Sequence, residues 1–186
     1  MEYKKLMEKL DFNHIREMND FVYKNKKHLK NEYIKGNIPS SDYFKITSLL
    51  SSQSRSPLWE ASFIGKNGGK KIPSSKGKGD LYLNGKYYEH KISGVNAGNL
   101  LHMVQIRLWQ NVDYIIQFID DDFNVITFEL THNEMERELK LLKASAAHGT
   151  KKANLGNENI EYRASIDPDS DDFKRWINNY KTDKYK

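Results

Sequence analysis

The chain has 186 residues, of which 38% are hydrophobic, 12% aromatic and 30% charged, so its length and composition predict one globular domain and exclude a disordered polymer. It contains no cysteine, which excludes disulfides, thiolate zinc sites and cysteine nucleophiles and makes a reducing cytoplasm the expected location. No stretch has the apolar run of a signal peptide or of a membrane span, so we expect a cytoplasmic protein with no membrane partner.

The N-terminal third of the sequence predicts helices. Apolar residues recur at roughly helical spacing over the first 34 residues, and this pattern predicts a long helix. A second, short helix is predicted at about 41–51. Ser56-Pro57 predicts the start of a third helix, because serine caps helices and proline favours the first helical position. The glycine- and lysine-rich segment 65–79 then predicts a loop.

A β-hairpin is predicted for residues 80–92, because alternating apolar residues flank an Asn-Gly pair at 84–85, the strongest two-residue hairpin signal. The tight turn fixes the register of the two strands, and in that register Asp80 faces Glu89. Lys91 projects from the same face of the hairpin, two residues beyond Glu89.

The remaining sequence predicts three more helices and three more strands. The alternation of helices and strands indicates the α/β (α+β) class, with a mixed β-sheet flanked by helices, in a single domain that spans residues 1–186. The expected elements are a helix at about 97–110, strands at 113–119 and 123–130, a helix at about 132–146, a short strand around 160–166 and a final helix around 170–180.

The carboxylates of the hairpin predict a metal site. Asp80 and Glu89 repel each other unless a cation lies between them. Oxygen ligands without cysteines or paired histidines favour Mg²⁺ over zinc. An ammonium beside such a metal suits phosphodiester hydrolysis, where Lys91 positions or helps to deprotonate the attacking water. The alternative is an exposed, salt-bridged strand face made of the same three residues.

The motif resembles that of the PD-(D/E)XK nucleases: Gly79-Asp80 on one strand, then Glu89-His90-Lys91 on the next, followed by a helix and a strand. Gly79 stands where that family usually has proline. The resemblance implies that Asp80 and Glu89 bind Mg²⁺, that the His90 carbonyl is a further ligand, and that Lys91 assists the nucleophilic water. It also implies a restriction-endonuclease-like core at about residues 56–130.

Many members of that family add a glutamate from the helix before the motif. Glu60 matches this position, and an exposed helix carboxylate is the equal alternative. More narrowly, the sequence resembles the small, cleavage-only subunits of heterodimeric type IIS restriction endonucleases. This likeness implies that the chain hydrolyses one strand of double-stranded DNA when it is assembled with a large, site-recognising subunit that nicks DNA.

Two other functions stay open. One is a self-sufficient, homodimeric PD-(D/E)XK endonuclease, and the other is a non-catalytic module that binds nucleic acid. Two facing carboxylates argue against the module, because they repel DNA unless a metal is present.

The net charge of +5 is concentrated between Lys66 and Lys91, where seven lysines stand against two acids. Such a segment predicts a polyanion-binding surface, although a solvated loop is the common alternative. Gln105, His102 and Trp109 are expected on one side of the helix at 97–110, where ordinary packing is the alternative to a place near the active site. The candidate DNA-binding residues are Lys70, Lys71, Lys76, Lys78, Gln105 and His148.

Overall fold

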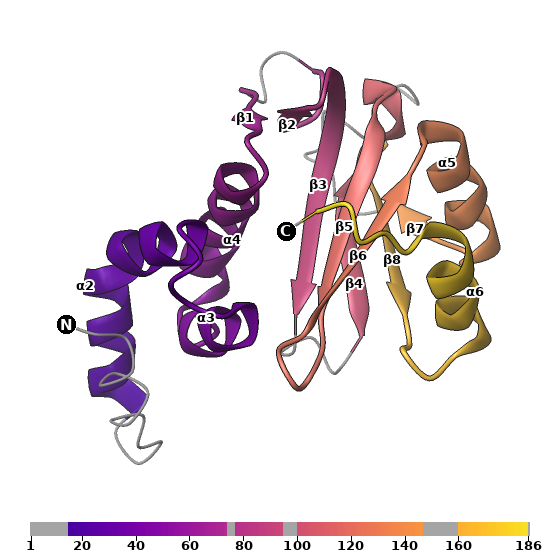
Figure 1. Ribbon diagram of the computed structural model, residues 1–186. Coiled ribbons are helices and arrows are strands. Elements are labelled where there is room, and N and C mark those ends of the chain that lie inside the picture. Colours follow the sequence, from indigo (N-terminus) through magenta and orange to yellow (C-terminus); the bar gives the residue numbers. More distant parts are fainter. Residues whose placement is uncertain (1–14, 74–76, 95–99, 147–159, 186) are drawn as a thin grey trace.

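The computed structural model describes residues 15–73, 77–94, 100–146 and 160–185 (Figure 1). Its N-terminal part is a layer of three helices whose buried side chains form one apolar cluster, with Tyr33 stacked on Tyr43 at 4.1 Å between ring centroids. None of the helices in these ranges is long and apolar enough to cross a membrane. The three helices are α2 (Ile15–Ile34), α3 (Ser40–Thr47) and α4 (Ser52–Lys66).

A five-stranded mixed sheet lies beside these helices, with the strand order β1-β2-β3-β5-β6. Its third and fourth strands, β3 and β5, are parallel, and all other neighbours in the sheet are antiparallel. Residues 114–119 of β5 are buried, as expected for a strand covered on both faces. The strands are β1 (Lys70–Lys71), β2 (Leu81–Leu83), β3 (Lys86–Gly94), β5 (Asp113–Ile119) and β6 (Val125–Leu130).

A second, antiparallel sheet and two helices cover the other face of the first sheet (Figure 1). The second sheet is tied to β3 by a hydrogen bond from the His102 backbone N to Ser93 Oγ, at 2.8 Å. The elements on this side are β4 (Leu101–Ile106), the 3-10 helix η3 (Leu108–Gln110), α5 (His132–Leu141), β7 (Ser145–Ala146), β8 (Tyr162–Ile166) and α6 (Asp171–Tyr180).

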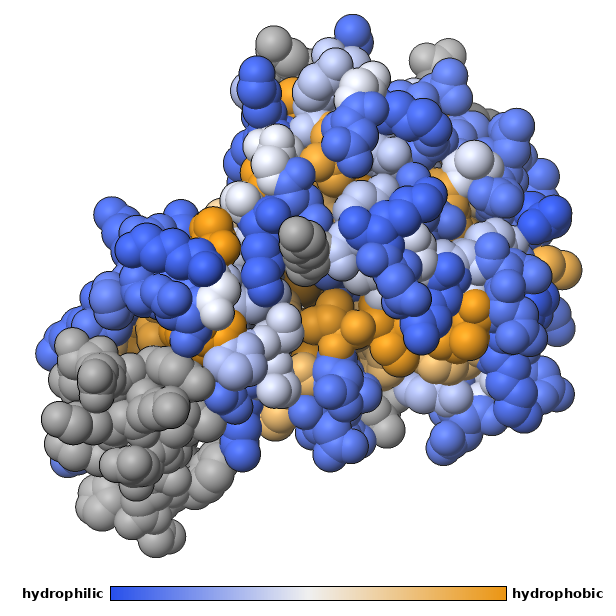
Figure 2. Space-filling model, in the orientation of Figure 1, coloured by the Kyte–Doolittle hydropathy of each residue, from blue (hydrophilic) through white to orange (hydrophobic). Residues whose placement is uncertain are grey.

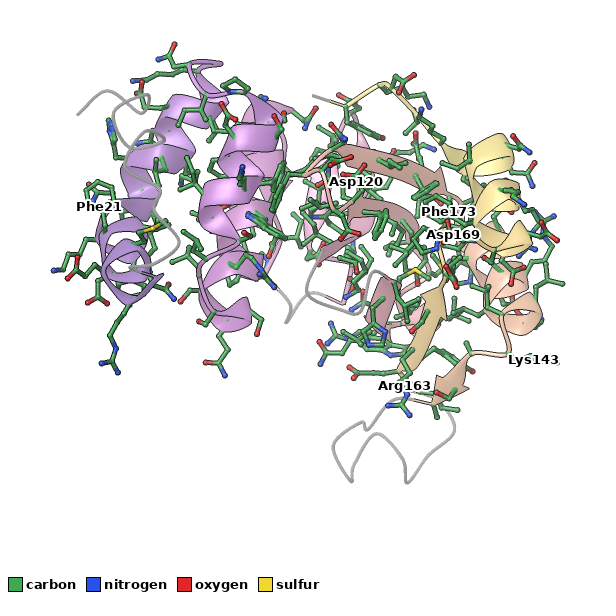
Figure 3. The ribbon with its side chains drawn as sticks, turned by 90° about the horizontal axis from the view of Figure 1, so that it is seen from below. Phe21, Asp120, Lys143, Arg163, Asp169 and Phe173 are labelled. Atoms are coloured by element: carbon green, nitrogen blue, oxygen red, sulfur yellow. The ribbon has the colours of Figure 1, made fainter. Side chains whose placement is uncertain are left out.

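Side chains fill the space on both faces of the five-stranded sheet (Figure 3). On one face, Phe173 of α6 makes edge contacts with Phe118 and Phe128 of the sheet. On the other face, a smaller cluster joins Phe63 of α4 to Leu81 of β2. On the face drawn in Figure 2, apolar residues reach the surface mainly in a band that runs from the edge of the helical layer across the lower part of the sheet.

These elements confirm the mixed α/β class, with a mixed sheet flanked by helices. The predicted helix at 97–110 is wrong in the described residues 100–110, which form strand β4 and η3. In β4 the buried and exposed residues alternate until Gln105, whose φ of +54° accompanies a shift of register against β8. This irregularity gives the apolar residues a spacing that also fits a helix. The segment forms a strand because it pairs with β8.

Three predicted boundaries also need correction. The helix expected to start at Ser56-Pro57 starts at Ser52 instead, because the carbonyl of Ser51 accepts hydrogen bonds from the backbone N–H groups of residues 54 and 55. The helix expected to run to 146 ends at Leu141, since residues 145–146 pair with β8. Lys70–Lys71, expected in a loop, pair with β2 as β1. Of the helix expected over the first 34 residues, positions 1–14 lie outside the described residues.

Candidate active site

The hairpin of β2 and β3 positions the candidate site, and its predicted register is confirmed. Asn84 and Gly85 adopt φ values of +50° and +84°, which is the geometry of a tight two-residue hairpin turn. The last regular pair is Leu81 with Tyr88. This register places Asp80, which directly precedes β2, beside the middle of β3.

Asp80 lies one residue beyond the regular pairs, so it does not form the ladder pair with Glu89 that the sequence predicted. Its backbone N donates to the Tyr88 carbonyl at 3.0 Å, and its Oδ1 accepts from the backbone N of His90 at 2.7 Å. The Asp80 carboxylate is thus fixed to the backbone of β3 between Glu89 and Lys91. This bend leaves the two carboxylates close enough to interact, as the pKa of Asp80 shows below.

Gly79 makes this bend feasible. Its φ is +72°, and a Cβ added there would lie 2.3 Å from the Tyr88 carbonyl oxygen. Proline is fixed near a φ of about −65° and cannot adopt this conformation. The glycine at the position where the PD-(D/E)XK pattern usually has proline therefore follows from the shape of this particular turn.

Glu89 is the most buried acid of the site, with 1% of its surface exposed. Its Oε1 accepts a hydrogen bond from Lys91 Nζ at 2.6 Å, and Arg107 Nη1 lies 3.8 Å from the same oxygen. A buried carboxylate requires such partners, because its desolvation is costly when it is left unpaired.

The two carboxylates share one electrostatic environment. Burial raises the pKa of Asp80 to about 7, with the negative charge of Glu89 as the next largest cause. The hydrogen bond from the His90 backbone and the charge of Lys91 lower the pKa of Asp80, and the charge of Glu60 raises it slightly. A bound cation would favour the charged carboxylate against these causes, so the site fits a positive ion.

The free oxygens of the two acids also fit a hard divalent cation. Asp80 Oδ2 and Glu89 Oε2 accept no hydrogen bond from the residues that the structure describes. In that same part of the chain, no three histidine or acidic side chains gather into a ready metal cluster. A Mg²⁺ ion here would therefore rest on two carboxylates and on oxygens from the backbone or water, which is a ligand set that Mg²⁺ commonly uses.

Glu60 of α4 lies at the edge of this group. Its side chain is 20% exposed, and its Oε1 is 3.0 Å from Lys71 Nζ of β1. Glu60 therefore acts on Asp80 through its charge while it is ion-paired with a lysine. Glu60 is therefore not the exposed helix carboxylate of the alternative, and its membership of the site stays a prediction.

The ring of His90 points to the α4 side of the sheet, as strand alternation requires for the neighbour of Glu89. It stacks on Phe63 with 4.5 Å between ring centroids, and its Nε2 lies 3.1 Å from Gln117 Oε1. Burial lowers the pKa of His90 to about 4, so the ring is neutral at neutral pH. The ring holds β3 in place while the backbone N–H of His90 binds Asp80.

Sequence reasoning missed three residues that border the site, and the first two form an ion pair. Arg107, which follows β4, lies between Glu89 and Glu161, and its Nε donates to Glu161 Oε1 at 2.8 Å. It was missed because residues 97–110 were expected to form a helix. Glu161 lies 54 positions further along the chain, and only the packing of the second sheet brings it here.

A third missed residue, Tyr114 of β5, pairs with Glu89 across the parallel strands. Its hydroxyl is buried without a hydrogen-bond partner in the described residues, and burial, followed by the charge of Glu89, raises its pKa. In the sequence, Tyr114 looks like any other apolar position of a buried strand.

The predicted DNA-binding residues that the structure describes lie on β1, in the segment before β2 and on β4. Lys70 and Lys71 lie exposed on β1, and Lys71 is paired with Glu60. Lys78 lies two residues before Asp80, with its Nζ 5.3 Å from the centre of the Tyr87 ring. Gln105 is exposed at the irregularity in β4. Lys76 and His148 lie outside the described residues.

The other residues expected beside Gln105 are also in β4 or η3 and not on a helix. His102 is exposed, and its Nδ1 lies 2.6 Å from Ser165 Oγ of β8. Trp109 is 44% exposed in η3. Neither side chain contacts the carboxylates in the structure.

Comparison with protein-family models and with curated proteins gives no match for this chain. The chemistry of the site therefore carries the functional argument. Two interacting carboxylates, a lysine bonded to one of them and a nearby arginine form a group that can bind a divalent cation and a phosphate together.

Proposed function

We propose that this chain is a magnesium-dependent DNA endonuclease of the PD-(D/E)XK kind. The observation that carries the proposal is the position of Asp80 beside Glu89 and Lys91, with the pKa of Asp80 raised to about 7 by burial and by Glu89. Strongly perturbed acids with a defined charge partner are typical of catalytic and metal-binding sites. A salt-bridged surface hairpin does not require a glutamate that exposes only 1% of its surface.

The proposed roles follow from the contacts. Asp80 and Glu89 hold Mg²⁺, with the His90 carbonyl as a further ligand, and the ion when bound stabilises negative charge on the scissile phosphate. Lys91 Nζ donates a hydrogen bond to Glu89 Oε1 at 2.6 Å. It is therefore placed to orient the attacking water and to balance the negative charge that develops on the phosphate. Arg107 supplies a second cation at the same carboxylate.

The arrangement of elements supports a restriction-endonuclease-like core. Helix α4 precedes the hairpin, the hairpin carries the acids and the lysine, and β5 returns parallel to β3 at the centre of the sheet. Glu60 of α4 lies near enough to act on Asp80. This order agrees with the motif as far as β3, whereas strand β4 and η3 stand where the motif implies a helix.

More specifically, we propose the catalytic subunit of a type IIS restriction endonuclease. It hydrolyses one strand of double-stranded DNA when a larger subunit that recognises the site and nicks the other strand delivers it. The support is that each described helix belongs to an apolar cluster that also contains residues of the sheets, so none of these helices forms a separate unit for reading a DNA sequence.

A plasmid assay tests this function. Supercoiled plasmid is incubated with Mg²⁺ and the purified chain, with a site-recognising nicking partner alone, and with both proteins. We expect nicked circles from the partner alone and linear DNA only from the mixture. Efficient cutting of both strands by the chain alone would support the homodimeric enzyme instead, and DNA binding without cleavage in any mixture would support the binding module.

A further inference from the structure

A groove of about 440 Å³ lies beside the candidate site, which is within the roughly 300–1,000 Å³ of typical ligand sites. The start of β3 forms one wall, and the segment that joins η3 to β5 forms the other. The residues that line it are Lys78, Lys86, Tyr87, Gln110, Asn111, Val112 and Asp113.

Tyr87, which lines the groove, lies on the same face of β3 as Glu89. Tyr87, Glu89 and Lys91 alternate along this strand, so neighbouring members of the series lie about 7 Å apart. That spacing is close to the distance between neighbouring phosphates along an extended strand of DNA. Lys78 reaches the same groove from the segment that leads into Asp80. A DNA strand that follows this face of β3 from Glu89 toward Tyr87 would pass over the groove.

Two lysines make the groove a place for phosphates. Lys78 is exposed, and its Nζ lies 5.3 Å from the Tyr87 ring centre. Lys86 is also exposed, and its Nζ lies 3.3 Å from Asp113 Oδ2. Asp113 is the acid of the groove, and its Oδ1 accepts from the backbone N of His132 at 3.2 Å. Asp113 offsets the charge of one of the two lysines, so the groove keeps the positive charge of the other.

The groove also contains an aromatic ring and two amides, which can stack on or hydrogen-bond to parts of a ligand other than its phosphate. Tyr87 is 38% exposed, which leaves part of its ring open for stacking. Gln110 is only 9% exposed, and its Oε1 is buried without a hydrogen-bond partner in the described residues. Buried polar atoms normally have partners, so this side chain indicates a donor that the rest of the described chain does not supply. Asn111 adds a second amide at the rim.

We infer that this groove binds the nucleotide next to the scissile phosphodiester. Lys78 and Lys86 contact its phosphates, the Tyr87 ring packs against its base or sugar, and the amide of Gln110 bonds to a base edge. The inference rests on the proposed nuclease function, because it takes DNA to be the substrate at Asp80 and Glu89. It adds a binding site that the motif does not contain.

Binding of a labelled DNA duplex to the full chain, measured by fluorescence anisotropy at several salt concentrations without divalent metal, tests the phosphate contacts. Lys78→Ala with Lys86→Ala should reduce the salt slope by about 0.9 per lost contact, or roughly eightfold weaker binding per contact at 0.1 M salt. The matched control is Lys140→Ala with Lys174→Ala, two exposed and ion-paired lysines of α5 and α6. The control should bind like the wild type.

Tyr87→Ala tests the base or sugar contact, and it should weaken DNA binding at least about fivefold with an unchanged salt slope. Tyr23→Ala on α2 is its matched control, because Tyr23 is also exposed and has Lys26 Nζ 3.7 Å from its ring centre. Circular dichroism spectra confirm that the variants keep the fold.

Each outcome decides the inference. The inference is overturned if the groove variants bind DNA like their controls. It is also overturned if only the lysine variants lose DNA binding, because the groove is then a general positive surface. Better competition by a duplex RNA than by DNA would reject a DNA nucleotide as the occupant. If the wild type cuts with its partner while the groove variants bind normally, only this inference fails. If the wild type never cuts DNA but the groove variants bind DNA weakly, the nuclease proposal fails and the groove remains a DNA-binding site.

Discussion

At the scale of single residues, opposing effects act on the pKa of Asp80. Burial and Glu89 favour its protonated form, whereas the His90 backbone N–H and the charge of Lys91 favour the carboxylate. The balance places its pKa at about 7, so near neutral pH a small change in local charge changes its protonation state. A divalent cation that binds there displaces the proton and takes over the role of neutralising the pair.

The raised pKa gives Asp80 a distinct effect on stability. Between its ordinary value of 3.8 and about 7 the folded chain keeps a proton that the unfolded chain has released, so the free energy of unfolding falls as pH rises through this range. Asp80→Asn removes this dependence. Urea denaturation without divalent metal at pH 4 to 8 should show the wild type losing stability relative to the variant as pH rises. Parallel curves would contradict the assigned pKa shift.

The proposed metal site predicts a selective stabilisation by Mg²⁺. An ion that binds only the folded chain should raise the melting temperature of the wild type at pH 8, and less so at pH 5, where protons compete for Asp80. Asp80→Asn and Glu89→Gln should lose the effect, whereas Asp122→Asn, an exposed acid in the turn between β5 and β6, should keep it. Differential scanning fluorimetry measures the shifts. An equal shift in all four proteins would place the ion elsewhere.

Lys91 should act on the reaction and not on metal binding. Lys91→Gln removes the group that positions water and balances charge, so DNA cleavage should fall by about 10²- to 10⁴-fold. The Mg²⁺-induced rise in melting temperature should remain, because Glu89 loses a competing cation from its Oε1. A variant that loses the thermal shift together with its activity would make Lys91 a structural partner of Glu89 instead.

At the scale of elements, the hairpin was predictable and β4 was not. The Asn-Gly turn fixes the register of β2 and β3 by local geometry, so the sequence alone places Asp80, Glu89 and Lys91 together. The apolar pattern of β4 fits both a helix and an irregular strand, and its pairing with β8 is a long-range event that no local pattern reports. Arg107 was missed for the same reason.

The bend at Gly79 could not be predicted from the local sequence either. It leads to a specific prediction. Gly79→Ala places a Cβ 2.3 Å from the Tyr88 carbonyl, so it should destabilise the fold by more than about 2 kcal/mol and displace Asp80. Gly85→Ala is the matched control in the same hairpin. Gly85 has a similar φ of +84° but open space around it, so the substitution should cost only about 1–2 kcal/mol of backbone strain. Equal losses in urea denaturation would contradict a specific clash at Gly79.

At the scale of the whole molecule, the candidate site lies between two sheets. The five-stranded sheet supplies Asp80, Glu89 and Lys91, and residues beside the strands of the second sheet supply Arg107 and Glu161. Composition and the order of elements predicted the mixed sheet and its helices. The packing of the second sheet over the hairpin was not predictable, because it depends on contacts between residues as far apart in the chain as Arg107 and Glu161, which are separated by 54 positions.

The central claim is that Asp80 and Glu89 belong to an active site that cuts DNA. Strand-specific cleavage by the assembled enzyme tests this claim most directly. A duplex with a different label on each strand is incubated with Mg²⁺, the nicking partner and one of four proteins: wild type, Asp80→Asn, Glu89→Gln or the exposed control Asp122→Asn. The wild type and the control should cut the second strand, and the two site variants, with melting curves that show them folded, should leave only the nick of the partner. Second-strand cleavage by folded Asp80→Asn at the rate of the wild type would contradict the assignment.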